Sequence, residues 1–263
     1  MTPFALIEGD SPIILGMPHG GGFVPDEVRA QLNDVGRGLT DTDWHIDRLY
    51  DGLLPGATVV RATFHRYVID ANRDPSGASL YPGQNTTGLV PETDFDGRPL
   101  WQQAPDTAEV ERRRLAFHAP YHAAVEAQIV RLKTKHKSVI FFDCHSIRSH
   151  IPFLFEGTLP VFNIGTNNGA TCAPAVQDAV RDVAAAAQDY THVVNGRFRG
   201  GWSTRHYGRP QQGLHAIQLE LAQRAYMAEQ APWTYDETKA QPLRHTLRTI
   251  LGRLAQVAPT LSP

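Results

Sequence analysis

The chain has 263 residues, of which 41% are hydrophobic, and its 25 basic and 27 acidic residues give a formal net charge of −2. This size and charge balance predict one domain spanning residues 1–263, and they argue against nucleic acid as the main partner. No apolar run approaches the ~20 residues that a membrane span requires, and the first residues lack signal-peptide character, so we expect no membrane partner and a cytoplasmic location.

Short apolar or β-branched runs alternate with helical segments along the chain, which predicts an α/β layer structure. The expected strands cover Ile13 to Met17, Ala57 to Ala62, Arg66 to Ile69, Ser138 to Phe142, Val161 to Ile164, His192 to Val194 and Leu214 to Leu219. The expected helices cover Asp41 to Leu54, Asp106 to Lys135, Ala173 to Gln188 and Asp236 to Val257.

Two irregular segments interrupt this alternation. Residues 72–105 are rich in Gly, Pro, Asn and Asp and show no periodicity. Loops of this length are often functional, so we expect this one to cover a site. Residues 195–208 combine glycines with three arginines and aromatic residues, which fits either a solvated surface loop or part of a binding site.

The run Pro18-His19-Gly20-Gly21-Gly22 places an imidazole on a loop nearly free of side chains, where a ligand or metal can approach the backbone. Alone it also fits an oxyanion loop or a turn. A second histidine, His145 in Asp143-Cys144-His145-Ser146, follows another apolar strand. Two strand ends that each deliver a histidine suggest a metal site.

A catalytic zinc usually takes three protein ligands and keeps one position for water, so a carboxylate is expected beside the histidines. The segment from Thr40 to Asp47 offers three. Asp41 is placed to cap the expected helix, while Asp43 and Asp47 are four residues apart and share a helix face. We predict Asp43 as the metal ligand and Asp47 as the alternative. Asp43 could instead have a purely structural role, as an acid in the first turn of a helix that the helix dipole favours.

A general base and a substrate anchor are also visible. In His215-Ala-Ile-Gln-Leu-Glu220, strand alternation turns Glu220 away from Leu219, a placement suited to a partly desolvated catalytic carboxylate. If a helix begins there, the alternative is a salt bridge from Glu220 to Arg224.

Asn72 and Arg73 follow an apolar run, and arginine binds carboxylates bidentately, so this pair could hold an acidic substrate.

These residues together resemble the N-formylglutamate deformylase (N-formylglutamate amidohydrolase) family over roughly residues 11–227. The motifs that carry the resemblance are Pro18-His19-Gly20-Gly21, Thr42-Asp43-Trp44, Val68-Ile69-Asp70-Ala71-Asn72-Arg73, Leu80-Tyr81-Pro82, Thr86-Thr87-Gly88-Leu89, Tyr121-His122, Asp143-Cys144-His145-Ser146, Gly200-Gly201 and Gln218-Leu219-Glu220. Their order along the chain is far more specific than any one motif.

The resemblance implies an α/β fold with a mixed sheet flanked by helices, similar to zinc carboxypeptidases and of the phosphorylase/hydrolase-like type. It implies hydrolysis of N-formyl-L-glutamate to formate and L-glutamate, the last step of a histidine degradation route. A related zinc deacylase acting on another small N-acyl amino acid is the alternative. Zinc carboxypeptidases hold the first histidine and the acid in a compact His-x-x-Glu, whereas position 22 here is glycine.

Carried over residue by residue, the resemblance gives each predicted group a role. Zinc, or another divalent metal, is expected on His19, Asp43 and His145, with Glu220 as the general base. Asn72 and Arg73 are expected to bind one substrate carboxylate. The second carboxylate needs another cation, for which we predict Arg205, and an arginine between Arg197 and Arg205 is expected to assist at the oxyanion.

Three rival interpretations remain within the sequence. His118 and His122 have the i, i+4 spacing of a helical metal pair, but the glutamate of a His-Glu-x-x-His site is missing and Pro120 disturbs the helix. Cys144 or Ser146 could act as a nucleophile, although Cys144 and His145 point to opposite faces of a strand and no Gly-x-Ser-x-Gly surrounds Ser146. A non-enzymatic zinc-binding module is disfavoured because closed structural zinc sites prefer cysteines.

Overall fold

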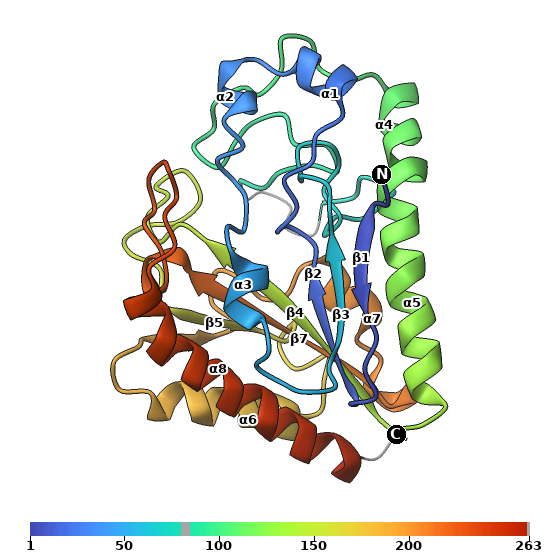
Figure 1. Cartoon of the computed structure of the whole chain (residues 1–263), viewed down its shortest axis with the longest axis vertical. Coiled ribbons are helices and arrows are strands. Elements are labelled where there is room, and N and C mark those ends of the chain that lie inside the picture. Colours follow the sequence, from blue (N-terminus) through green and yellow to red (C-terminus); the bar gives the residue numbers. More distant parts are fainter. Residues whose placement is uncertain (80–84, 262–263) are drawn as a thin grey trace.

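The computed structural model describes residues 1–79 and 85–261. The motif Leu80-Tyr81-Pro82 therefore lies outside the described residues. The strands are β1 (Phe4–Ile7), β2 (Ile13–Met17), β3 (Thr58–Ala62), β4 (Val139–Ile147), β5 (Phe162–Gly165), β6 (His192–Val194) and β7 (Leu214–Ala222). They form one sheet in the order β1-β3-β2-β4-β7-β5-β6 (Figure 1).

The sheet is mixed. Strands β3, β2, β4 and β7 are parallel to one another, whereas β1 and β5 run antiparallel to their neighbours β3 and β7. The predicted mixed α/β sheet flanked by helices is confirmed. Because the four central strands are parallel, their carboxyl ends meet at one edge of the sheet, where open α/β folds bind ligands.

Helices cover both faces of this sheet. The α-helices are α1 (Asp26–Gln31), α2 (Asp34–Arg37), α3 (Ile46–Tyr50), α4 (Thr107–Arg113), α5 (Ala119–Lys133), α6 (Pro174–Ala186), α7 (Trp202–Tyr207) and α8 (Glu237–Val257). A π turn, η1 (Arg114–His118), joins α4 to α5, and short 3-10 turns are η2 (Pro210–Gln212), η3 (Gln223–Ala225) and η4 (Ala258–Thr260). In Figure 1, α6 and α8 lie together across one face, and α5 runs along the other side near β1.

Alternation along β4 divides the core between the two faces. Ile140, Phe142 and Cys144 pack in the cluster that includes α3, α6 and α8, whereas Val139 and Phe141 pack in the cluster that includes α5. All nine residues of β4 are buried, as predicted for a central strand covered on both faces. The same alternation places the polar residues at positions 143 and 145 on the α5 side of the sheet.

Two expected elements are wrong. Residues 66–69 form a buried turn instead of a strand, because their backbone bonds close locally, as in the 2.9 Å bond from the Val68 N–H to the His65 carbonyl. Their apolar side chains are buried, and the apolar pattern reflected this burial and not a strand. The helix expected from Asp41 to Leu54 covers only α3, since His45 adopts a left-handed conformation with φ 58° and starts the helix late.

The remaining differences lie at edges and ends. β1 was not expected from the sequence, and β4 and β7 extend three residues or more beyond their predicted ends. The last helix matches its prediction closely, and the Asp236 side chain caps it by accepting a bond from Lys239 N–H at 3.1 Å. Among the described residues, none of the helices combines the length and apolar character that crossing a bilayer requires.

Candidate active site

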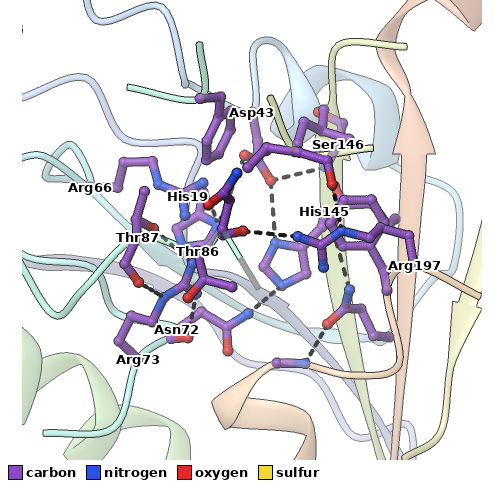
Figure 2. A pocket seen from close by; sticks show the side chains of 18 residues that line it. His19, Asp43, Arg66, Asn72, Arg73, Thr86, Thr87, His145, Ser146 and Arg197 are labelled. Atoms are coloured by element: carbon purple, nitrogen blue, oxygen red, sulfur yellow. Dashed lines mark hydrogen bonds and ion pairs between the residues drawn. The ribbon is translucent and has the colours of Figure 1, made fainter. Parts of the chain in front are cut away.

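His19, Asp43 and His145 converge at the carboxyl ends of the parallel strands, and each contributes a possible ligand atom within 4.8 Å of the others (Figure 2). His19 follows β2 and His145 lies in β4. The Nδ1 atoms of His19 and His145 lie 3.8 Å and 3.3 Å from the two Asp43 carboxylate oxygens. All three side chains are buried. The structure therefore brings together the three residues predicted to hold a metal.

Backbone contacts fix this arrangement. The Asp43 N–H donates to the His19 carbonyl at 3.1 Å, and Ser146 N–H donates to the Asp43 carboxylate at 2.9 Å. A Cβ atom on Gly21 would stand 2.4 Å from the backbone of Thr63, so the glycine loop packs directly on the chain after β3. The close approach at Gly21 is therefore made by the chain itself, and the approach of a ligand or metal to this loop stays a prediction.

Each histidine also contacts a carboxylate through its other ring nitrogen. His19 Nε2 lies 2.7 Å from Asp70 Oδ1, and His145 Nε2 lies 3.0 Å from Asp143 Oδ1. Asp70 and Asp143 are fully buried. Metal-bound histidines commonly donate their second N–H to a carboxylate, and the His19–Asp70 contact is a hydrogen bond of this kind. The His145–Asp143 contact is a close pairing of the ring with a carboxylate, and His145 Nε2 also faces the Asn72 amide nitrogen.

No role was predicted for Asp70 or Asp143. Each lies two residues before a predicted site residue, Asn72 or His145. Within a strand, a spacing of two places both side chains on one face, and this signal could have found Asp143. Asp70 had no such signal, because it follows residues 66–69, where the sequence pattern predicted a strand and the structure has a turn.

Burial and charge set the protonation of the group. Burial, with a further effect from the Arg66 charge, lowers the pKa of His19, so its imidazole is neutral and able to bind a cation. Burial also lowers the pKa of His145, but the Asp143 carboxylate beside it raises the pKa well above its usual value. The carboxylates thus create a negative field around His145, which attracts positive charge.

Glu220 lies in β7 directly opposite His145 in the β4–β7 ladder. The strand continues to Ala222, so the alternative in which a helix begins at Glu220 is wrong. Burial raises the pKa of Glu220 to about 8. Gln218, on the same face, donates to the Glu220 carboxylate at 3.4 Å. A desolvated carboxylate therefore faces the group formed by the two histidines and Asp43.

These residues border a pocket with a cavity volume of about 90 Å³. Its lining comes from the strand ends and from the loops that follow or precede them: His19, Asp43, Arg66, Asn72, Arg73, Asn85, Thr86, Thr87, Phe95, His145, Ser146, Ile147, Leu154, Arg197, Phe198, Gly201, Gln218 and Glu220. The irregular segment 72–105 supplies several of them, so its described part borders the candidate site. The second irregular segment contains α7 and also reaches the pocket.

Asn72 and Arg73 line this pocket together. The Asn72 amide nitrogen lies 3.0 Å from His145 Nε2, and the Asn72 backbone N–H donates to Asp70 at 2.8 Å. Arg73 donates to the carbonyl and the hydroxyl of Thr87, each at 2.8 Å. An amide and a guanidinium thus stand beside the candidate metal group, as the sequence predicted.

Arg66 and Arg197 also line the pocket. The sequence patterns did not identify either of them individually as a substrate-binding residue. Arg66 is buried; its guanidinium lies 3.4 Å from His19 Nδ1 and 2.5 Å from Asp70 Oδ2. Arg197 donates to the carbonyls of Leu154 at 2.9 Å and Asn85 at 3.0 Å. Arg197 was one end of a range of candidates, whereas Arg66 stands where the sequence pattern predicted a strand.

The predicted Arg205 lies apart from this lining. Its side chain donates to the Gly200 carbonyl at 3.0 Å, within the loop that leads into α7. Among the described residues, Arg66, Arg73 and Arg197 are the arginines that border the cavity, and Arg205 is not one of them. The segment reaches the pocket through Arg197 and not through Arg205.

The other two acids of the Asp41–Asp47 segment point elsewhere. Asp47 pairs with Arg61 and borders a separate cavity of about 520 Å³ beside α3, so it does not join the histidines. Asp41 accepts a bond from the Phe95 N–H at 2.9 Å, and α3 begins after His45, so its predicted helix cap is wrong. Asp43 precedes α3 and therefore shares no helix face with Asp47.

The rival residues have other partners. His118 Nε2 contacts the Arg73 carbonyl at 3.1 Å, and His122 contacts the Ala71 carbonyl and the Tyr207 hydroxyl. Cys144 is buried in the hydrophobic cluster on the opposite face from His145, as the structural interpretation predicted. The Ser146 hydroxyl accepts a bond from the Tyr226 hydroxyl at 2.7 Å.

Comparison with known proteins agrees with this site. A family model described as N-formylglutamate amidohydrolase matches residues 11–227. A protein named N-formylglutamate deformylase from Pseudomonas aeruginosa is 47% identical over 249 residues, covering 94% of this chain and 93% of the relative. One of the same name from Pseudomonas putida is 46% identical over 250 residues, with the same coverage of both.

A solved structure shares the whole fold. The crystal structure of N-formylglutamate amidohydrolase from Ralstonia eutropha matches with a TM-score of 0.80 and 26% identity, covering 99% of this chain and 98% of that chain. The fold, the strand-end site and these relatives define an enzyme of the amidohydrolase class. The chain belongs to the N-formylglutamate amidohydrolase family.

Proposed function

We propose that this enzyme performs the metal-dependent hydrolysis of N-formyl-L-glutamate to formate and L-glutamate. The substrate is the one named in the matched family and in the relatives described above. The observation that carries the metal dependence is the pairing of each site histidine with its own buried carboxylate, 2.7 Å from His19 and 3.0 Å from His145. The resemblance further supports a place as the last step of a histidine degradation route.

The donor set fits a divalent cation, with zinc as our choice. Two imidazole nitrogens and one carboxylate are a ligand set that catalytic zinc takes, and all three residues border the pocket. His19, Asp43 and His145 would hold the ion. A bound divalent metal polarises a carbonyl and lowers the pKa of water to about 7.

Glu220 would move the proton. It takes a proton from the attacking water as the water oxygen bonds to the formyl carbon, and it returns that proton to the glutamate nitrogen as the C–N bond breaks. Burial, which raises its pKa to about 8, strengthens it as a base near neutral pH. The Arg66 guanidinium, 3.4 Å from His19 Nδ1, would stabilise negative charge developing on the formyl oxygen.

The substrate carboxylates would bind to the arginines of the pocket. Asn72 and Arg73, anchored on Thr87, supply an amide and a guanidinium for one carboxylate. For the second we propose Arg197 instead of Arg205, because Arg197 borders the cavity. A cavity of about 90 Å³ favours a small substrate over a peptide chain. A deacylase acting on another small N-acyl amino acid is the second candidate.

Formate release by metal-stripped and zinc-restored enzyme tests this function. We expect N-formyl-L-glutamate turnover to fall to background after complete metal removal and to return with zinc. N-acetyl-L-glutamate, assayed alongside, decides between formyl and larger acyl groups. Undiminished turnover without metal would overturn the metal mechanism and favour Ser146, which borders the pocket, as a nucleophile.

A further inference from the structure

Two histidines on the α4–η1–α5 helix contact the segment that carries the substrate anchor. His118 Nε2 lies 3.1 Å from the Arg73 carbonyl oxygen, and His122 Nε2 lies 2.8 Å from the Ala71 carbonyl oxygen. A carbonyl oxygen only accepts, so both ring nitrogens donate. The two acceptors belong to the residues on either side of Asn72. The helix therefore holds the backbone immediately before and after this side chain.

We propose that His118 and His122 are positioning residues that fix the Asn72–Arg73 anchor in its substrate-binding geometry. This inference rests on the proposed function, in which Asn72 and Arg73 bind a substrate carboxylate. Neither histidine borders the cavity, so neither is a catalytic residue. They act through the backbone of residues 71–73.

The hydrogen bonds of His122 fix its tautomer. Its Nδ1 lies 2.6 Å from the Tyr207 hydroxyl, while its Nε2 donates to the Ala71 carbonyl. The neutral ring accepts from Tyr207 on one side and donates to the loop on the other. Burial lowers the pKa of His122 well below its usual value, which keeps this neutral form. Both nitrogens are therefore engaged, and a metal has no access to either.

Helix α7 holds Asn72 from the other side. Ser203 N–H donates to the Asn72 side-chain oxygen at 2.8 Å, and a Cβ atom on Gly201 would stand 2.3 Å from its side-chain nitrogen. Trp202, between them in the chain, packs edge-on against His122 with ring centroids 4.6 Å apart. The Asn72 amide is thus fixed at its backbone by the histidines and at its side chain by α7.

The local sequence explains how one helix presents both histidines. Pro120 has no N–H to bond to the preceding turn, and the wider π turn η1 ends two residues before it, at His118. The rings of His118 and His122 lie 4.4 Å apart and face the same loop. The spacing that resembles a helical metal pair instead serves two neighbouring carbonyls.

His122→Phe tests the proposal, with His206→Phe as the matched control. Phenylalanine keeps a ring of similar size and removes both hydrogen bonds. His206 stacks on the same Trp202 at 4.3 Å but has no bond to residues 71–73 among the described contacts. We expect His122→Phe to raise KM for N-formyl-L-glutamate about tenfold with a smaller change in kcat, as loss of ground-state binding predicts. The control should leave KM unchanged.

Amide hydrogen exchange of residues 70–74 gives a readout that needs no turnover. We expect faster exchange in His122→Phe than in the wild type or in His206→Phe, because the turn loses a bond to the helix. In an Asn72→Ala background, His122→Phe should change KM less than it does alone, since part of the anchor that the histidine positions is already lost.

Each of these measurements tests the positioning role of His122. An unchanged KM, unchanged exchange, or fully multiplicative effects of His122→Phe and Asn72→Ala would overturn the positioning role. If the wild type does not hydrolyse N-formyl-L-glutamate, the proposed function fails, and the exchange rates alone decide whether the histidines fix this segment.

Discussion

His19 and His145 lie near the carboxyl ends of neighbouring strands, whereas His118 and His122 lie four residues apart on a single helix. Both pairs are buried and their rings are close, with centroids 4.9 Å and 4.4 Å apart. They differ in their partners. Each strand-end histidine contacts a carboxylate, while each helical histidine contacts a neutral backbone carbonyl.

This difference distinguishes the candidate cation site from the helical pair, for which we propose a positioning role. Carboxylates add negative charge, and beside His145 the Asp143 carboxylate raises the pKa well above its usual value against the effect of burial. At His19, burial and the Arg66 charge outweigh the Asp70 carboxylate and lower the pKa. Carbonyls add no net charge, and burial lowers the pKa of His122 well below its usual value. The partner of the second ring nitrogen therefore indicates a metal role better than the spacing of the histidines does.

The largest effect is expected at Glu220, the acid of the strand-end region. Glu220→Gln should lower kcat by about a thousandfold or more while bound metal stays constant, because the amide cannot accept the water proton. Glu126→Gln removes an acid of the helical region, 3.6 Å from His206, and is the matched control. Near-normal turnover in Glu220→Gln would disprove its role as the base.

Wild-type kcat/KM should fall as the pH falls through the pKa of the base, because only the carboxylate accepts the proton.

An intermediate effect is expected when the partners of the histidines are removed. Asp70→Asn replaces the carboxylate on His19 and should weaken metal affinity by about 10- to 100-fold. Tyr207→Phe removes the neutral partner of His122 and should leave metal affinity unchanged. Titration with zinc against a competing chelator measures both. Equal affinities in the two variants would remove the distinction between the two histidine pairs.

The smallest effect is expected for the two arginines of the second irregular segment. Arg197→Ala should raise KM for N-formyl-L-glutamate about tenfold by removing a charged partner of the second carboxylate. Arg205→Ala should change KM less, because Arg205 lies outside the cavity lining. N-formyl-L-alanine, which lacks that carboxylate, should show no difference between the variants. The reverse order for N-formyl-L-glutamate would restore Arg205 as the anchor.

Much of the site could be predicted from local patterns. His19, His145 and Glu220 follow or end apolar strands, and period-two alternation gives the face on which His145 and Glu220 lie. Asp43 was chosen among three nearby acids through a helix that proved to begin later, at Ile46. Its placement beside the histidines follows from the loop geometry before α3, which no periodicity encodes.

The sequence by itself determined the mixed α/β architecture, the family and the residues brought to the strand ends, because these depend on apolar periodicity and on ordered motifs. Only the tertiary structure decided which partners those residues have. Asp70 and Asp143 join the histidines, Arg197 replaces Arg205 at the pocket, and His118 and His122 contact the Asn72 segment. These choices depend on contacts between segments far apart in the chain, where hydrogen bonding and burial select one partner among several of the same chemical type.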